Sequence, residues 1–153
     1  MVIHHSGKKR NIWEIEAIHM VNLYIKDFLN KDVEHYLRPL DSGHIRNGKT
    51  TFCAYHYLVD SNGTVKKLLS DKYIGWHCGN WEYNTKSIAI CINDNLENKS
   101  PNKKVINTLK NLIRKYQYKT NISQILGHCE IKPTTTCPGK SFLGEKGWKN
   151  LLY

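Results

Sequence analysis

Short apolar runs alternate with amphipathic helical segments along this chain, and this alternation limits the fold more than any other feature. The run at 87–92 (SIAICI) predicts a buried central strand, because a strand covered on both faces is apolar at consecutive positions. Apolar residues then recur with a helical period from Val105 to Tyr116. Strands that alternate with helices predict an α/β fold, with a mixed sheet flanked by helices.

The remaining segments extend the same pattern, read from apolar spacing and turn residues. The other predicted elements are a strand at 2–5, a helix at 12–29, a loop at 38–51, a hairpin of strands 53–60 and 64–69, and a strand at 122–126. No repeat, low-complexity segment or long linker interrupts the 153 residues. We therefore expect a single domain over residues 1–153, long enough to fold without disulfide bonds.

Charge and composition exclude several classes of protein. Lys and Arg number 23 against 13 Asp and Glu, a net charge of +10, which favours a polyanionic partner such as nucleic acid or a cell wall. No apolar run approaches the roughly 20 residues that span a bilayer, so we expect no transmembrane segment. The start, MVIHHSGKKR, lacks the apolar core of a signal peptide, and we expect synthesis in the cytoplasm.

Three residues carry side chains suited to zinc. His4 lies on the first predicted strand, His128 directly after the last, and Cys137 nine residues later. Three such ligands leave a fourth position for water, which is the arrangement of catalytic zinc sites. Spacing alone does not bring them together, and a lone strand histidine or a lone cysteine is more often a packed core residue. From the residues alone, both interpretations stay open.

A series of short motifs runs in order over nearly the whole chain. They are 2–6 (VIHHS), 54–60 (AYHYLVD) with 62–64 (NGT), 76–79 (WHCG), Asn84, 87–90 (SIAI), 127–128 (GH) and 137–139 (CPG). The series resembles the zinc-dependent N-acetylmuramoyl-L-alanine amidases, the family of type-2 amidases, phage lysozyme-type amidases and peptidoglycan recognition proteins. The resemblance implies that family's fold, and His4, His128 and Cys137 as ligands of Zn²⁺.

The resemblance also implies residues that assist catalysis. Tyr55, from the family's Tyr-His motif, is expected to face the active site, and Thr135, two residues before Cys137, to act beside it. The interval before the cysteine is one residue longer than in the commonest version, so Thr134 and Thr136 stay alternatives to Thr135. Some cytoplasmic members carry a Glu on the central strand, where this chain has Cys91. We therefore favour a mechanism that uses the tyrosine and a threonine.

Three further residues are expected near the substrate. His77 is predicted either to contact substrate or to lie on plain surface, and Trp76 to be core or groove wall. Asn84 is predicted to steady a turn, with substrate binding as a second role. His5 and His56 alternate away from the predicted site along their strands, so we expect structural roles for both.

The implied function is hydrolysis of the amide bond between N-acetylmuramic acid and L-alanine by zinc-activated water. The substrate is expected to be peptidoglycan or a muropeptide, whose acidic stem peptides suit a basic protein. With no wall-binding module or signal peptide, a monomeric phage or prophage endolysin is expected, delivered by a separate lysis protein. A muropeptide-recycling enzyme in the cytoplasm is the alternative.

Two other functions stay open. One is a non-catalytic peptidoglycan-binding recognition module, a branch in which the cysteine ligand is typically replaced; the presence of Cys137 favours the enzyme. The other is a basic nucleic-acid-binding protein. Dispersed lysines and the lack of a nucleic-acid-binding motif disfavour it, so no specific nucleic acid partner is expected.

Overall fold

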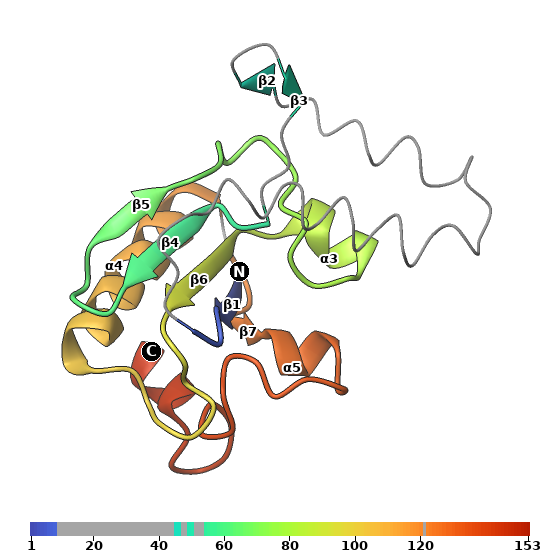
Figure 1. The fold of residues 1–153 in the computed structure, drawn as a ribbon. Helices are drawn as coiled ribbons and strands as arrows, with labels where there is room; N and C mark the ends of the chain where they lie inside the picture. Colours follow the sequence, from blue (N-terminus) through green and yellow to red (C-terminus); the bar gives the residue numbers. More distant parts are fainter. Residues whose placement is uncertain (9–44, 47–48, 51–53, 121) are drawn as a thin grey trace.

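A five-stranded sheet organises the computed structural model, which describes residues 1–8, 45–46, 49–50, 54–120 and 122–153 (Figure 1). Its strand order is β5-β4-β6-β1-β7. The strands are β1 (Val2–His5), β4 (Tyr57–Asp60), β5 (Val65–Lys67), β6 (Ala89–Asn93) and β7 (Leu126–Gly127). The helices are α3 (Trp81–Lys86), α4 (Lys103–Thr120), α5 (His128–Ile131) and the 3-10 helix η1 (Trp148–Leu152).

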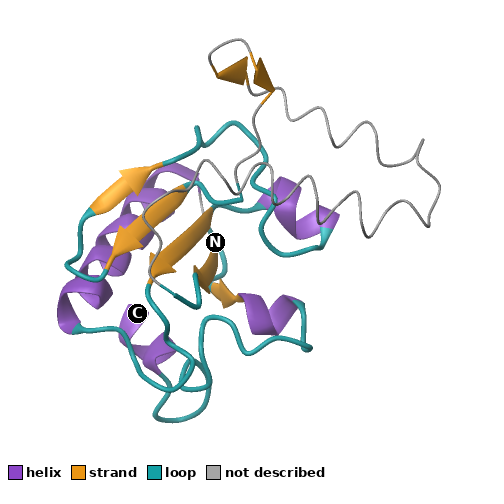
Figure 2. Ribbon diagram, viewed as in Figure 1, coloured by secondary structure: helices purple, strands orange, loops and turns teal. Residues whose placement is uncertain are grey.

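The strand β6 lies at the centre of the sheet, as the run at 87–92 predicts. All five of its residues are buried, and it pairs in parallel with both β1 and β4. β7 is parallel to β1, whereas β5 returns antiparallel to β4. The sheet is therefore mixed and carries helices, as Figure 2 shows, and the predicted α/β class is confirmed.

One face of the sheet forms the main hydrophobic core with α4 and the C-terminal segment. Alternate strand residues, among them Ile3, Val59 and Ile90, are fully buried there. The apolar stripe of α4 covers them, with Leu109 and Ile113 at its centre. Within the described part of the chain, no helix is both long and apolar enough to cross a lipid bilayer. The side chain of His4 points to the opposite face of β1, away from this core.

Three predicted strands are shorter than expected. The hairpin strands span Tyr57–Asp60 and Val65–Lys67, joined at the predicted Ser-Asn-Gly turn. The strand predicted at 122–126 is wrong except at its end, since only Leu126 and Gly127 join the sheet. Leu126 pairs with Val2, the first residue of β1. Because β1 begins there, it has no backbone with which residues 122–125 could pair. Their apolar pattern reflects packing instead: Ile125 is buried.

Several short elements were not predicted. The six-residue helix α3 begins after Asn80, whose side chain accepts a hydrogen bond from the amide of Tyr83. Helices this short show no clear apolar period, so only the N-cap residue signals them. Ile45–Arg46 (β2) and Lys49–Thr50 (β3) pair antiparallel inside the predicted loop at 38–51. The predicted helix at 12–29, the rest of that loop and Cys53 lie outside the described residues.

Candidate metal centre

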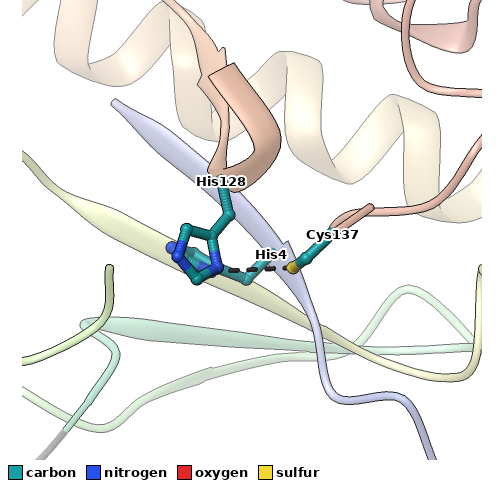
Figure 3. Close-up of side chains that lie close together, drawn as sticks. All are labelled: His4, His128 and Cys137. Carbon is teal, nitrogen blue, oxygen red and sulfur yellow. Dashed lines mark hydrogen bonds between the residues drawn. The ribbon is translucent and has the colours of Figure 1, made fainter. Parts of the chain in front are cut away.

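The three residues proposed as zinc ligands meet at the carboxyl ends of two neighbouring strands. Ile3 of β1 lies opposite Gly127 of β7, so the residues that follow them, His4 of β1 and His128 at the start of α5, are neighbours. Their ring centroids are 4.7 Å apart. Cys137 approaches from the following loop, and one ligand atom from each residue lies within 4.8 Å of the others (Figure 3).

The spacing and chemistry of these atoms fit a zinc ion. His4 Nδ1 and Cys137 Sγ are 3.8 Å apart. Zinc–nitrogen and zinc–sulfur bonds at a tetrahedral angle put two such atoms about 3.6 Å apart. Two imidazoles and one thiol are ligands that zinc prefers, and they leave one coordination position for water or substrate. Donor sets of this kind are found in catalytic zinc sites.

Backbone hydrogen bonds hold Cys137 in place. The amide of His5 donates to its sulfur over 3.4 Å, and its carbonyl accepts from the amide of Cys129 over 2.7 Å. Its own amide donates to the hydroxyl of Thr135 over 3.2 Å. Cys137 is therefore fixed against the residue that follows each histidine, His5 of β1 and Cys129 of α5.

Burial sets the charge of each candidate ligand. It holds the pKa of His4 well below the usual value, with help from the neighbouring rings of His77 and His128. It also lowers the pKa of His128, although a hydrogen bond to the Cys78 carbonyl opposes the change. Both imidazoles are therefore neutral at pH 7 and have a nitrogen lone pair. Burial raises the pKa of the Cys137 thiol to about 12, so metal binding must displace its proton.

Tyr55 and Thr135 border the three candidate ligands. The ring centroid of Tyr55 is 5.1 Å from that of His4, and the Thr135 hydroxyl accepts the amide of Cys137. That bond uses an oxygen lone pair and leaves the hydroxyl hydrogen for an acceptor. Of the two alternatives, Thr136 donates to the carboxylate of Glu97 over 2.7 Å, and Thr134 is exposed. The geometry favours Thr135, whose role stays a prediction.

His77 lies behind His4. It is 7% exposed, and both of its ring nitrogens form hydrogen bonds. Nδ1 lies 2.9 Å from His4 Nε2, and Nε2 lies 3.0 Å from Ser87 Oγ. Burial is the main cause that lowers its pKa to about 3. Its contact with substrate stays a prediction. The hydrogen bond between His77 and His4 was not predicted from the sequence motif.

The other two predicted substrate residues flank this histidine. Trp76 is buried, with its ring centroid 5.6 Å from that of the half-exposed Trp81. Asn84 is buried on α3, and its side-chain oxygen accepts from the amides of His77 and Cys78. Asn84 therefore steadies the 76–79 segment, from a helix rather than from the predicted turn. Contact of either residue with substrate stays a prediction.

Nearby polar residues have partners within the protein. His5 Nδ1 accepts from the amide of Leu96 at 2.9 Å, and His56 Nδ1 accepts from the amide of Ala89 at 3.1 Å. His56 Nε2 donates to the carbonyl of Tyr73. Cys91 pairs in register with His4 and is fully buried, so a glutamate there would share the face of His4. This chain has a thiol at that point.

The fold and the site together define a class: an α/β domain that gathers two histidines and a cysteine at the ends of parallel strands. The family model for N-acetylmuramoyl-L-alanine amidases matches residues 1–140. The chain therefore belongs to the N-acetylmuramoyl-L-alanine amidase family, as the motif series predicts.

Individual relatives agree with this family. Peptidoglycan-recognition protein SD of Drosophila simulans is 27% identical over 109 residues, or 69% of this chain. The chain spans 57% of the length of that curated relative.

Among solved structures, the fold is similar to that of N-acetylmuramoyl-L-alanine amidase LysC from Clostridium intestinale URNW. The TM-score is 0.65 at 17% identity, over 98% of this chain and 79% of the amidase. LysCS from the same organism, described as an endolysin amidase, gives 0.64 at 18%, over 98% and 78% of the two chains. Peptidoglycan recognition protein-LE, solved with a monomeric diaminopimelic acid-type peptidoglycan, gives 0.59 at 23%, over 92% and 73%. These likenesses concern the fold.

Proposed function

We propose that this chain is a zinc-dependent amidase that cleaves the bond between N-acetylmuramic acid and L-alanine in peptidoglycan. The observation that carries the proposal is the convergence of His4, His128 and Cys137 on one point at the strand ends. Membership of the amidase family supports the same reaction. The peptidoglycan fragment bound by the recognition protein of similar fold supports a peptidoglycan or muropeptide substrate.

The chemistry required matches these residues. When bound, zinc polarises the scissile carbonyl and lowers the pKa of its water towards about 7. The chain's part is to present two neutral imidazoles and one thiolate in fixed positions. Tyr55 beside His4 and Thr135 beside Cys137 would then supply hydroxyl donors for the negative charge that develops on the carbonyl oxygen.

The decisive experiment digests purified sacculi with the protein, with and without a chelator. New L-alanine amino termini should appear, disappear when the metal is removed, and return when Zn²⁺ is added back. New reducing sugar ends would instead identify a glycosidase. Binding to sacculi without any cleavage by the zinc-loaded protein would identify a recognition module, and binding only to DNA would favour a nucleic-acid-binding protein.

The two hydroxyl groups give a separate prediction. Tyr55→Phe and Thr135→Val should each lower kcat by about 100-fold, the usual loss when one donor to a developing oxyanion is removed. Zinc content should be unchanged, because neither residue is a proposed ligand. Thr136→Val is the matched control, since its hydroxyl is engaged with Glu97. Full activity in Thr135→Val together with a loss in Thr136→Val would transfer the role to Thr136.

We also propose that the protein acts as an endolysin, as a monomer. The net charge of +10 favours binding to an acidic wall polymer. Lysis of intact cells from outside, or only when a lysis protein is co-expressed, would support this role. Activity confined to small soluble muropeptides would favour a recycling enzyme.

A further inference from the structure

We propose that His77 and the carbonyl of Cys78 are positioning groups that fix the tautomers of both candidate zinc ligands. They hold the Nε2 atoms of His4 and His128 protonated, so that both Nδ1 lone pairs are available to the metal. The inference rests on the metal centre of the proposed function. The inference gives the 76–79 segment a structural role: it orients the two histidines of that centre.

The tautomer of His4 follows from a chain of hydrogen bonds. The Ser87 hydroxyl donates its one hydrogen to the carbonyl of Tyr83 over 2.6 Å. In its second contact, with His77 Nε2 at 3.0 Å, the hydroxyl oxygen must therefore accept a hydrogen bond from the ring. His77 is therefore protonated at Nε2, where it donates to Ser87, and in the neutral form of the ring its Nδ1 carries a lone pair. That lone pair, 2.9 Å from His4 Nε2, can only accept. His4 is thus protonated at Nε2, and its Nδ1 faces the sulfur of Cys137 at 3.8 Å.

The tautomer of His128 follows from one contact. Its Nε2 lies 3.3 Å from the carbonyl oxygen of Cys78. A carbonyl oxygen accepts only, so His128 Nε2 must carry the proton. Its Nδ1 is left for the metal. The two adjacent residues of the 76–79 segment therefore set the two imidazoles in the same way.

A single buried side chain fixes this pair of positioning groups. The Asn84 side-chain oxygen accepts from the amides of His77 and Cys78, both over 3.2 Å, and from the Cys78 thiol over 3.1 Å. Asn84 is only 3% exposed, and α3 holds it in place. The ligands are therefore preoriented before a metal arrives. Loss of such outer partners typically costs about 10–100-fold in metal affinity.

The test measures zinc affinity by competition with a chromophoric chelator, and the imidazole tautomers by long-range ¹H–¹⁵N NMR of the metal-free protein. The wild type should show His4 and His128 protonated at Nε2. His77→Leu, which removes the acceptor but keeps the volume, should weaken zinc binding by about 10–100-fold and give His4 a mixture of tautomers. His77→Asn should restore most of the affinity, because its side-chain oxygen takes the place of Nδ1.

Ser87→Ala provides a second, milder variant at the end of α3. It removes the partner of His77 Nε2, together with the hydroxyl's bond to the Tyr83 carbonyl, and keeps the His77 ring. It should also give His4 mixed tautomers and weaker zinc binding. Thr85→Ala is its matched control, because that exposed hydroxyl bonds only within the helix. Wild-type affinity and an unchanged His4 tautomer in both His77→Leu and Ser87→Ala would overturn the inference. If the wild type binds no zinc, the proposed function fails, and the metal-free tautomers still test the positioning groups.

Discussion

Replacing Cys137 with serine should abolish amidase activity, with a fall of at least about 1,000-fold, because the metal supplies several kcal/mol of transition-state stabilisation. A serine hydroxyl does not ionise near neutral pH and binds zinc poorly, so only the two imidazoles would remain. Activity on sacculi and zinc content after gel filtration, by atomic emission, are the two measurements.

Cys129→Ser is the matched control for this variant. Cys129 is the half-buried neighbour of His128 that packs against the core cluster. The same chemical change there should leave zinc content intact. Wild-type zinc content in Cys137→Ser would contradict the proposed ligand set. Unchanged binding of peptidoglycan fragments by the inactive variant would show that recognition does not need the metal.

Gly139→Ala should destabilise the protein by at least about 3 kcal/mol, the sum of backbone strain and overpacking. Gly139 has a φ of +126°, a conformation that favours glycine, and a Cβ there would overlap the carbonyl oxygen of Leu96. That backbone cannot easily yield, because the Leu96 amide donates to His5 and its side chain is buried. Urea denaturation in the presence of chelator measures the change without the contribution of bound metal.

Gly144→Ala separates the two causes. Gly144 also has a positive φ, +95°, but a Cβ there would meet nothing within 4 Å. It should cost about 1–2 kcal/mol of strain alone. Equal losses in both variants would mean that the contact with Leu96 plays no part. A larger loss in Gly139→Ala, with weaker zinc binding, would show that this contact holds the Cys137 loop against β1.

Periodicity and residue type predict the parts of this fold that depend on local sequence. The buried run of β6, the hairpin turn and the long helix α4 follow from patterns that need no knowledge of tertiary contacts. The short length of β7 does not, because it is set by where β1 begins. The helix α3 also escapes prediction, since six residues carry too little periodic signal and only Asn80 marks its start.

The candidate site is predictable as a set of residue types but not as a geometry. His4 and Cys137 are 133 positions apart, and spacing alone gives no reason for them to meet. The motif series supplies that reason, and the strand order then accounts for it physically. The role of the 76–79 segment could not be read from sequence. Its hydrogen bonds to the two histidines depend on the distance between a loop and the sheet, and on an asparagine seven positions along the chain from His77.

The placement of β1 between β6 and β7 has a consequence for biosynthesis. A ribosome adds about 5–20 residues per second, so the 133 positions between His4 and Cys137 take about 7–27 s to translate. The neighbouring strand β7 is completed only about ten positions before the end of that interval, and the thiol only at its end. If the proposed zinc site is correct, metal loading would therefore belong to the last stage of maturation, after translation has passed the cysteine.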